Sequence, residues 1–342
     1  MSEFKNINYE NKIRIALSAY AANIIESDCF SFSKKKNSLL NSVILNFYQK
    51  ADCSISIRIR EYKQSLVNSL TRNDAKINDK AISLIVHGKE TELKKIYTEK
   101  TKSDANWTIT LSMKTVQLLT DDHSSSEEKY YKSPAIYIKA LLEEYSRLPY
   151  YQREKIIFKN ILDDINTAIK CCYAIKLTNI YGKHFYVKPY MVENDPLSMY
   201  QYVIGYNYRY DEDNASEVLG IRLSRLKDAE IQYYQDGTLT PYENKKIQQA
   251  LRSKGVQFVS GNSSEISIWL SDEGIRKYNE QQHLRPLGRI DDKDNHIYHF
   301  DCTEIQILFY FLRFGKDARI ISPDSLKDQF KEFYNEAYKA YK

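Results

Sequence analysis

The chain has 342 residues, more than one domain of typical size, and its length predicts two or three domains. The 42% hydrophobic and 28% charged residues are typical of a soluble globular protein, and no apolar run of membrane-spanning length or signal-peptide pattern is evident, so we expect no membrane partner. A formal net charge of +5 permits nucleic-acid binding without requiring it, and five cysteines without metal-ligand spacing indicate a reduced, cytoplasmic protein with no metal site.

Residues 12–49 predict one strand followed by two helices. Apolar and polar residues alternate over 12–18, as in a half-buried strand, and a short helix is expected over 19–26. A second helix has the apolar face Leu40, Ile44, Phe47 and Tyr48. This order is the ribbon-helix-helix pattern, in which two strands pair into a ribbon that can enter a major groove.

A second copy of the pattern follows later in the chain. Residues 107–112 repeat the alternation of residues 13–18 with a serine in register, and helices are expected over 113–120 and 134–145. One strand cannot pair with itself, so we expect the two copies to form a pseudo-dimer within one chain. The alternative is a pair of unrelated strand-helix segments.

The outward face of the ribbon carries the candidate nucleic-acid contacts. Lysines at the start of the second helix lie where phosphate would be bound, although a run of three lysines is also typical of a solvated loop. The candidate residues of this module are Lys12, Arg14, Lys34, Lys35, Lys36, Thr108 and Thr110. Between the two copies, helices are expected over 57–70 and 79–100.

An amphipathic helix over 150–169 leads into a run of short strands rich in Tyr, Val and Ile. Turn residues separate the strands, and no helical pattern interrupts them. The expected strands cover residues 172–177, 184–190, 200–206, 218–223 and 228–231. Five short strands in about sixty residues predict a small antiparallel barrel.

The sequence Val187-Lys-Pro-Tyr190, followed by residues 202–206 (Tyr-Val-Ile-Gly-Tyr) and 221–226 (Ile-Arg-Leu-Ser-Arg-Leu), resembles the WYL domain, a small Sm/SH3-like barrel. Gln201 replaces the Trp that gives the domain its name, and Val203 replaces the Leu. The resemblance implies a ligand-sensing module, often for nucleic acid. The candidate RNA-binding residues of the barrel are Lys176, His184, Lys188, Tyr190, Tyr202, Tyr206, Arg222 and Arg225. An ordinary barrel core with surface charges is the alternative.

After a helix over 241–254, the remaining chain predicts another module. Its order of strand, helix, strand, strand, helix and strand is that of a ferredoxin-like fold, and a last helix follows. Residues 310–315 and 318–323 are similar to the C-terminal extension of WYL domains. That resemblance implies a homodimer, and the apolar run over 305–314 fits either a shared interface or a core.

No phosphate-binding loop, nucleophile elbow or metal-ligand cluster is evident. Some ribonucleases carry an Arg and a His on a helix with four to six residues between them, and Arg276 with His283 and Arg289 with His296, each with six residues between, meet that spacing. Hits of this kind are expected by chance, so we expect a protein that is not an enzyme and has no cofactor.

We expect three modules, over 1–149, 150–234 and 235–342. Their order is similar to that of the WYL-domain accessory proteins of type VI-D CRISPR systems, and residues 38–48 and 222–225 contribute to the match. The resemblance implies a protein that binds single-stranded RNA and stimulates an RNA-guided ribonuclease. Two alternatives stay open: a transcriptional regulator that binds duplex DNA through the ribbon and senses a ligand in the barrel, and a protein-protein adaptor.

Overall fold

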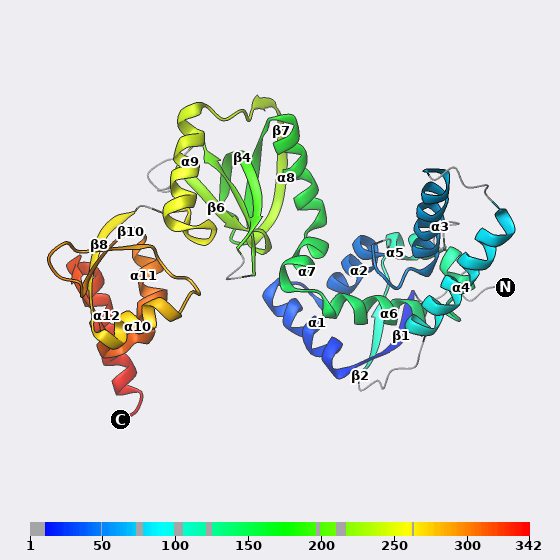
Figure 1. The fold of residues 1–342 in the computed structure, drawn as a ribbon, viewed down its shortest axis with the longest axis horizontal. Coiled ribbons are helices and arrows are strands. Elements are labelled where there is room, and N and C mark those ends of the chain that lie inside the picture. The colour runs from blue at the N-terminus through cyan, green and yellow to red at the C-terminus, as the bar shows by residue number, and fades with distance from the viewer. Residues whose placement is uncertain are drawn as a thin grey trace. The chain divides into compact units, whose positions relative to one another are not determined.

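The computed structural model describes residues 11–48, 50–72, 78–98, 105–120, 125–195, 199–209, 217–261 and 263–342. The chain forms two compact units, Met1–Lys159 and Asn160–Lys342 (Figure 1). Helices and antiparallel sheets occur in both units, which confirms the α+β class. In the part of the chain that is described, no helix is both long and apolar enough to cross a bilayer.

The first unit contains a two-stranded antiparallel ribbon. Strand β1 (Lys12–Leu17) pairs with β2 (Ala105–Thr110), and Arg14 lies opposite Thr108. On β1 the side chains that face the helices are buried, on β2 Ile109 is buried while Ala105 and Trp107 are half-buried, and the alternate side chains are mostly exposed. The two strands, their pairing and the outward positions predicted from the alternation are therefore confirmed.

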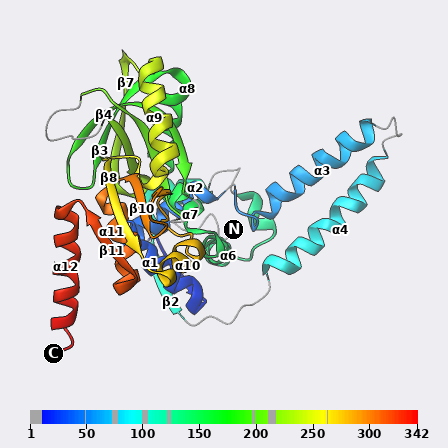
Figure 2. The ribbon, with the colours of Figure 1, turned by 60° about the vertical axis from the view of Figure 1, so that its left-hand side comes forward.

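Each strand of the ribbon is followed by helices. Those after β1 are α1 (Ala19–Ser31) and α2 (Lys36–Phe47); those after β2 are α5 (Met113–Thr120), the short 3-10 helix η2 (Ser125–Lys129) and α6 (Pro134–Arg147). The two predicted helices between the copies are α3 (Ile55–Arg72) and α4 (Asp79–Thr98), which form an antiparallel pair that projects from the unit (Figure 2). The last two residues of the predicted 79–100 helix lie outside the described residues.

The two halves of the first unit exchange hydrogen bonds at their helix starts. Ser18, which caps α1, donates its backbone N–H and its hydroxyl to Glu143 of α6 at 2.6 and 2.7 Å. Ser112 stands in the same place before α5, and its backbone N–H donates to Asn41 Oδ1 of α2 at 2.7 Å. Each half thus fixes the first helix of the other through its own second helix.

A buried ion pair connects α1 to the end of the unit. The Arg153 guanidinium, on α7 (Tyr150–Ile157), donates to both oxygens of Asp28 at 2.7 and 3.0 Å, and Tyr145 Oη donates to Asp28 Oδ2 at 2.8 Å. Asp28 has no exposed surface, and these three donors satisfy its carboxylate.

Residues 150–169 form two helices where one was predicted. Helix α7 ends at Phe158, and α8 (Lys159–Cys171) begins directly afterwards. The Phe158 ring is buried at the edge of Phe32, with ring centroids 5.6 Å apart. The backbone of Phe158 is non-helical, with φ −103° and ψ 25°, so the amphipathic pattern continues while the helix does not.

The second unit begins with α8 and a five-stranded antiparallel sheet in the order β6-β5-β4-β3-β7. The strands are β3 (Tyr173–Asn179), β4 (His184–Asn194), β5 (Gln201–Asn207), β6 (Val218–Arg222) and β7 (Leu226–Asp236), with the 3-10 turn η3 (Leu223–Arg225) between the last two. These bounds confirm all five predicted strands, and the first strand of the module pairs with both the second and the last.

The predicted closed barrel is not found: within the described residues, edge strands β6 and β7 do not pair with each other. The sheet nevertheless bends. A bulge interrupts the β4–β5 pairing between Pro189 and Met191, and a Cβ on Gly205 would lie 2.4 Å from the Val187 side chain. Bulges and close-packed glycines are the features by which sheets curve.

Helix α9 (Pro241–Lys254) covers one face of this sheet. A capping box fixes its start, in which the Thr240 hydroxyl accepts from the Glu243 N–H and Glu243 accepts from the Thr240 N–H. Its Ile247 is fully buried in a cluster with Tyr202 and Ile204 of β5. The sheet therefore has a covered side, which faces α9.

The C-terminal part of the second unit has a four-stranded antiparallel sheet in the order β11-β8-β10-β9. The predicted order of elements is confirmed: β8 (Ser264–Leu270), α10 (Asp272–Glu280), β9 (Gly288–Ile290), β10 (Ile297–Cys302), α11 (Glu304–Phe311), the 3-10 turn η5 (Leu312–Asp317), β11 (Ala318–Ser322) and α12 (Asp324–Lys339). Alternate strand residues share one core with α10, α11 and α12, so these helices lie on the same face of the sheet.

The apolar run over 305–314 is divided between core and surface. Ile307, Tyr310 and Phe311 are buried, whereas Ile305 and Phe309 are 61% and 58% exposed. The two exposed residues are four positions apart on α11, so they form one apolar stripe on its outer side.

Candidate nucleic-acid interface

The eight residues predicted to bind RNA fall into two groups. Four are packed on the side of the sheet that α9 covers: Lys188, Tyr190, Tyr202 and Tyr206. The others lie on three different strands and on the turn η3: Lys176, His184, Arg222 and Arg225. The structure thus does not bring all eight together in one pocket.

Lys188 and Tyr202 are held in the fold. Lys188 Nζ donates to both carboxylate oxygens of Glu243 at 3.0 and 3.1 Å, and its side chain is only 16% exposed. Tyr202 is 7% exposed within the α9 cluster, so the expectation of an exposed ring at this position is wrong. The β5 strand turns Tyr202 toward α9, and apolar neighbours there exclude a base from its face.

Tyr206 and Tyr190 are half-buried against the same cluster. Burial raises the pKa of Tyr206, and the nearby Glu217 and Glu243 carboxylates raise it further. The phenol therefore stays protonated at neutral pH. Arg222 lies over the Tyr200 ring, with 3.2 Å between its guanidinium carbon and the ring centroid. That guanidinium stacks within the protein.

A second arrangement of cations and rings lies on the sheet next to the covered region. Lys176 of β3 pairs with Tyr186 of β4, and the Tyr208 N–H donates to the Tyr186 carbonyl at 3.0 Å. The Arg209 guanidinium lies 4.3 Å from the Tyr186 ring centroid, and the Tyr186 and Tyr208 rings meet edge to face at 6.3 Å. We call Lys176, Tyr186, Tyr208 and Arg209 the β3–β5 row.

The β3–β5 row combines partial exposure with positive charge. Arg209 is exposed and the two tyrosines are half-buried. Burial raises the pKa of Tyr208, while the Arg209 charge lowers it. Lys176 is 3.4 Å from Glu230, an exposed pair that solvent screens strongly. A guanidinium beside two rings suits an unstacked base and its phosphate.

The turn between β3 and β4 adds another cation and ring. The Asn179 side chain accepts from the N–H groups of Tyr181 and Lys183, both at 2.9 Å, and Gly182 adopts a positive φ of 83°. This turn presents Tyr181 with 77% of its surface exposed, and Arg225 Nη1 donates to its hydroxyl at 2.8 Å. His184 follows at the start of β4, beside Thr178 Oγ1 at 3.0 Å. The predicted residues Arg225 and His184 are therefore accessible.

In the first unit, the outward ribbon residues are exposed as predicted. The three lysines at the start of α2 differ in their surroundings. Lys36 forms an ion pair with Glu26 at 3.0 Å and lies 4.0 Å from the Trp107 ring centroid, and Lys34 lies 5.3 Å from the Phe158 ring centroid. Lys35 directly precedes α2, and all three lysines are exposed.

The sequence analysis missed four residues: Tyr181, Tyr186, Tyr208 and Arg209. Tyr186 shares a face with His184 and Lys188 by the two-residue period of strands, so the alternation was a usable signal. Tyr208 and Arg209 follow the predicted end of their strand at residue 206, and nothing in the sequence places Arg209 over Tyr186. Arg276, one member of an Arg-His spacing attributed to chance, forms ion pairs with Glu273 and Glu280.

The fold occurs in a protein of known structure. A solved structure described as a CRISPR Cas-related protein superposes with a TM-score of 0.75 and 21% sequence identity, over 99% of this chain and 98% of that one. Proteasome accessory factor B/C of Arthrobacter aurescens matches with a TM-score of 0.30 and 11% identity, over 70% of this chain and 38% of that one. The second likeness is too weak to carry an argument. No protein-family model matches the sequence, and no curated protein matches it significantly.

Proposed function

We propose that this protein is a non-enzymatic accessory protein of a type VI-D CRISPR system, which binds single-stranded RNA and stimulates the RNA-guided ribonuclease. The observation that carries the RNA-binding part is the β3–β5 row, where Arg209 lies over Tyr186 beside Tyr208. The full-length likeness to a CRISPR Cas-related protein supports the CRISPR part.

The same proposal assigns the modules. The first unit is an internal ribbon-helix-helix pseudo-dimer, supported by the β1–β2 pairing and the reciprocal serine contacts. The bent sheet is a WYL module of the Sm/SH3-like class, and the C-terminal sheet with its helices is the ferredoxin-like extension. The protein acts in the cytoplasm as a homodimer, for which the stripe of Ile305 and Phe309 provides an apolar contact.

A regulator that binds duplex DNA is the second candidate. The exposed Arg14 and Thr108, opposite each other on the ribbon, favour it because such a face can enter a major groove. However, the two strands present different side chains, so the ribbon would read two unlike half-sites.

The deciding experiment is a fluorescence-anisotropy titration of the purified protein at two salt concentrations. Labelled single-stranded RNA, single-stranded DNA and duplex DNA would be compared, followed by a ribonuclease assay with the RNA-guided nuclease of a type VI-D system. We expect preferred binding of single-stranded RNA and faster RNA cleavage. A duplex preference that disappears in Arg14→Ala would support the regulator, and no binding of any nucleic acid at moderate salt would support an adaptor.

A further inference from the structure

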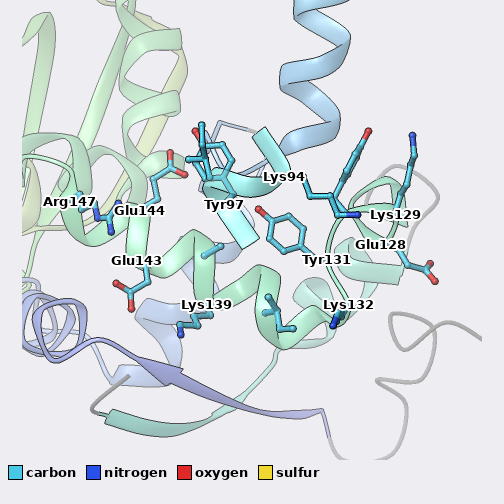
Figure 3. A pocket seen from close by; sticks show the side chains of 14 residues that line it. Lys94, Tyr97, Glu128, Lys129, Tyr131, Lys132, Lys139, Glu143, Glu144 and Arg147 are labelled. Atoms are coloured by element: carbon cyan, nitrogen blue, oxygen red, sulfur yellow. The ribbon is translucent and has the colours of Figure 1, made fainter. Parts of the chain in front are cut away.

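A groove in the first unit, remote in sequence from the β3–β5 row, has the composition of a ligand site. It lies between the last turns of α4 and one side of α6, with a volume of about 680 Å³ (Figure 3). That volume is in the range of small-molecule sites, which hold about 300–1,000 Å³. Ile136 and Ala140, both on α6, give it an apolar floor, and Ile136 is 39% exposed although it is apolar.

Basic side chains surround the groove. Figure 3 shows Lys94 with Tyr97 on the α4 side, Lys132 and Lys139 on the opposite side, and Arg147 at one end. No carboxylate of the described residues lies within ion-pair distance of Lys132 or Lys139. Their ammonium groups are thus available to an anionic ligand.

The acidic side chains of the groove are largely engaged elsewhere. Both oxygens of Glu143 accept from Ser18, and Figure 3 shows its carboxylate directed away from Tyr97. Glu144 accepts from the backbone N–H groups of Asp52 and Cys53, the latter at 2.8 Å, and burial raises its pKa. Five cations line the groove against three carboxylates, so positive charge exceeds negative charge there: Lys94, Lys129, Lys132, Lys139 and Arg147 against Glu128, Glu143 and Glu144.

Aromatic surface is available beside these cations. Tyr97 is half-buried on the α4 side, where burial raises its pKa and keeps the phenol neutral. Tyr131 is fixed nearby by the hydrogen bond that its hydroxyl donates to the Cys53 carbonyl at 2.6 Å. A planar ring can therefore contact Tyr97 and the apolar floor while an attached anion reaches the lysines.

We propose that this groove binds a nucleoside phosphate, with the base against Tyr97 and the Ile136–Ala140 floor and the phosphate between Lys132 and Lys139. Charge-assisted hydrogen bonds to two ammonium groups hold the phosphate, and the rings hold the base. The ligand is either a free nucleotide or one nucleotide of an RNA chain, because both present the same base and phosphate.

The test is isothermal titration of the full-length protein with adenosine 5′-monophosphate, adenosine and inorganic phosphate. We expect the monophosphate to bind about tenfold or more tightly than either fragment. The Lys132→Ala/Lys139→Ala double variant should lose most of that advantage and leave adenosine binding unchanged, and Tyr97→Ala should weaken both nucleoside ligands. The matched control is Lys95→Ala, an exposed lysine of α4 that does not line the groove.

Two results overturn the proposal: no monophosphate binding at millimolar concentration, or equal binding by the folded double variant and the wild type. A 5′-phosphorylated trinucleotide RNA distinguishes the sources, since it binds more tightly than the monophosphate if the groove holds an RNA chain and less tightly if it holds a free nucleotide. The titrations are repeated with the Tyr186→Ala/Arg209→Ala variant, which lacks the two main residues of the β3–β5 row. Ligand binding at the groove is thereby tested independently of the proposed RNA interface.

Discussion

The Glu143 carboxylate accepts two hydrogen bonds from Ser18, one from its backbone N–H at 2.6 Å and one from its hydroxyl at 2.7 Å. The two residues belong to different halves of the first unit and are 125 positions apart. This contact joins the end of the ribbon strand β1, the start of α1 and the middle of α6 at one point.

Replacing Glu143 by Ala should destabilise the first unit by about 1–3 kcal/mol, because the half-buried donors of Ser18 lose their acceptor. The chain has two tryptophans, Trp107 in the first unit and Trp269 in the second. Urea unfolding followed by tryptophan fluorescence in a Trp269→Phe background therefore reports the first unit alone. Glu61→Ala, an exposed change on α3, is the control; equal midpoints for the two variants would contradict the prediction.

Tyr186→Ala and Arg209→Ala should each weaken single-stranded RNA binding, with about 1–3 kcal/mol lost for the ring, because base stacking on an aromatic face contributes that much. Anisotropy titration measures the change, and the salt dependence should decrease for Arg209→Ala. Tyr242 and Lys246 form a similar ring-cation pair on α9, 5.4 Å from nitrogen to ring centroid. The Tyr242→Ala/Lys246→Ala variant is the matched control, and an equal loss there would remove the β3–β5 row from the interface.

Lys188→Met should lower stability and leave the RNA affinity of the folded protein unchanged. The substitution leaves Glu243 without its ammonium partner at 3.0 Å, at the start of α9, and breaking such a half-buried pair costs about 1–3 kcal/mol. Urea unfolding in a Trp107→Phe background reports the second unit, and anisotropy at low temperature reports binding. A large loss of RNA affinity with unchanged stability would place Lys188 in the interface after all.

The C-terminal module should lose stability in acid through Asp317. Hydrogen bonds from Lys277 and Ser271, at 2.6 and 2.9 Å, hold the pKa of this carboxyl below its usual range. A lowered folded-state pKa means that the stabilisation is complete above the unfolded value of about 3.9 and is lost as the pH falls through the lowered one. Asp317→Asn should therefore flatten the dependence of the urea midpoint on pH between about pH 5 and pH 2, and an unchanged slope would contradict this cause.

The alternation of apolar residues was enough to predict the two strands of the ribbon and which of their side chains face outward. The alternation placed Ile13, Ile15 and Leu17 on one face of a strand, and the similar alternation before Ser112 marked the second strand. The strands of the bent sheet were predictable for the same reason, since strand period and turn residues are local properties. The pairing of distant segments followed because one strand alone cannot satisfy its backbone.

Which part of this sheet face α9 covers, and which part stays accessible, was not predictable from the local pattern. Tyr202 has the same sequence character as an exposed stacking ring, and only the packing of Ile247 from α9 decides that it is buried. Similarly, the 150–169 pattern continues through Phe158, where the backbone leaves the helical conformation and the ring packs against Phe32. The groove beside α6 depends on α4, α6 and η2 meeting, so no single stretch of sequence contains its signal.

The pairing of β1 with β2 inside one chain changes how the first unit assembles. Partners that are joined covalently meet at a fixed effective concentration, so the ribbon forms in a unimolecular step and dilution does not separate its strands. Because both strands belong to one chain, their surroundings can also differ: the Ser18 N–H donates to the Glu143 carboxylate, the Ser112 N–H donates to the neutral Asn41 amide oxygen, and Arg14 lies opposite Thr108.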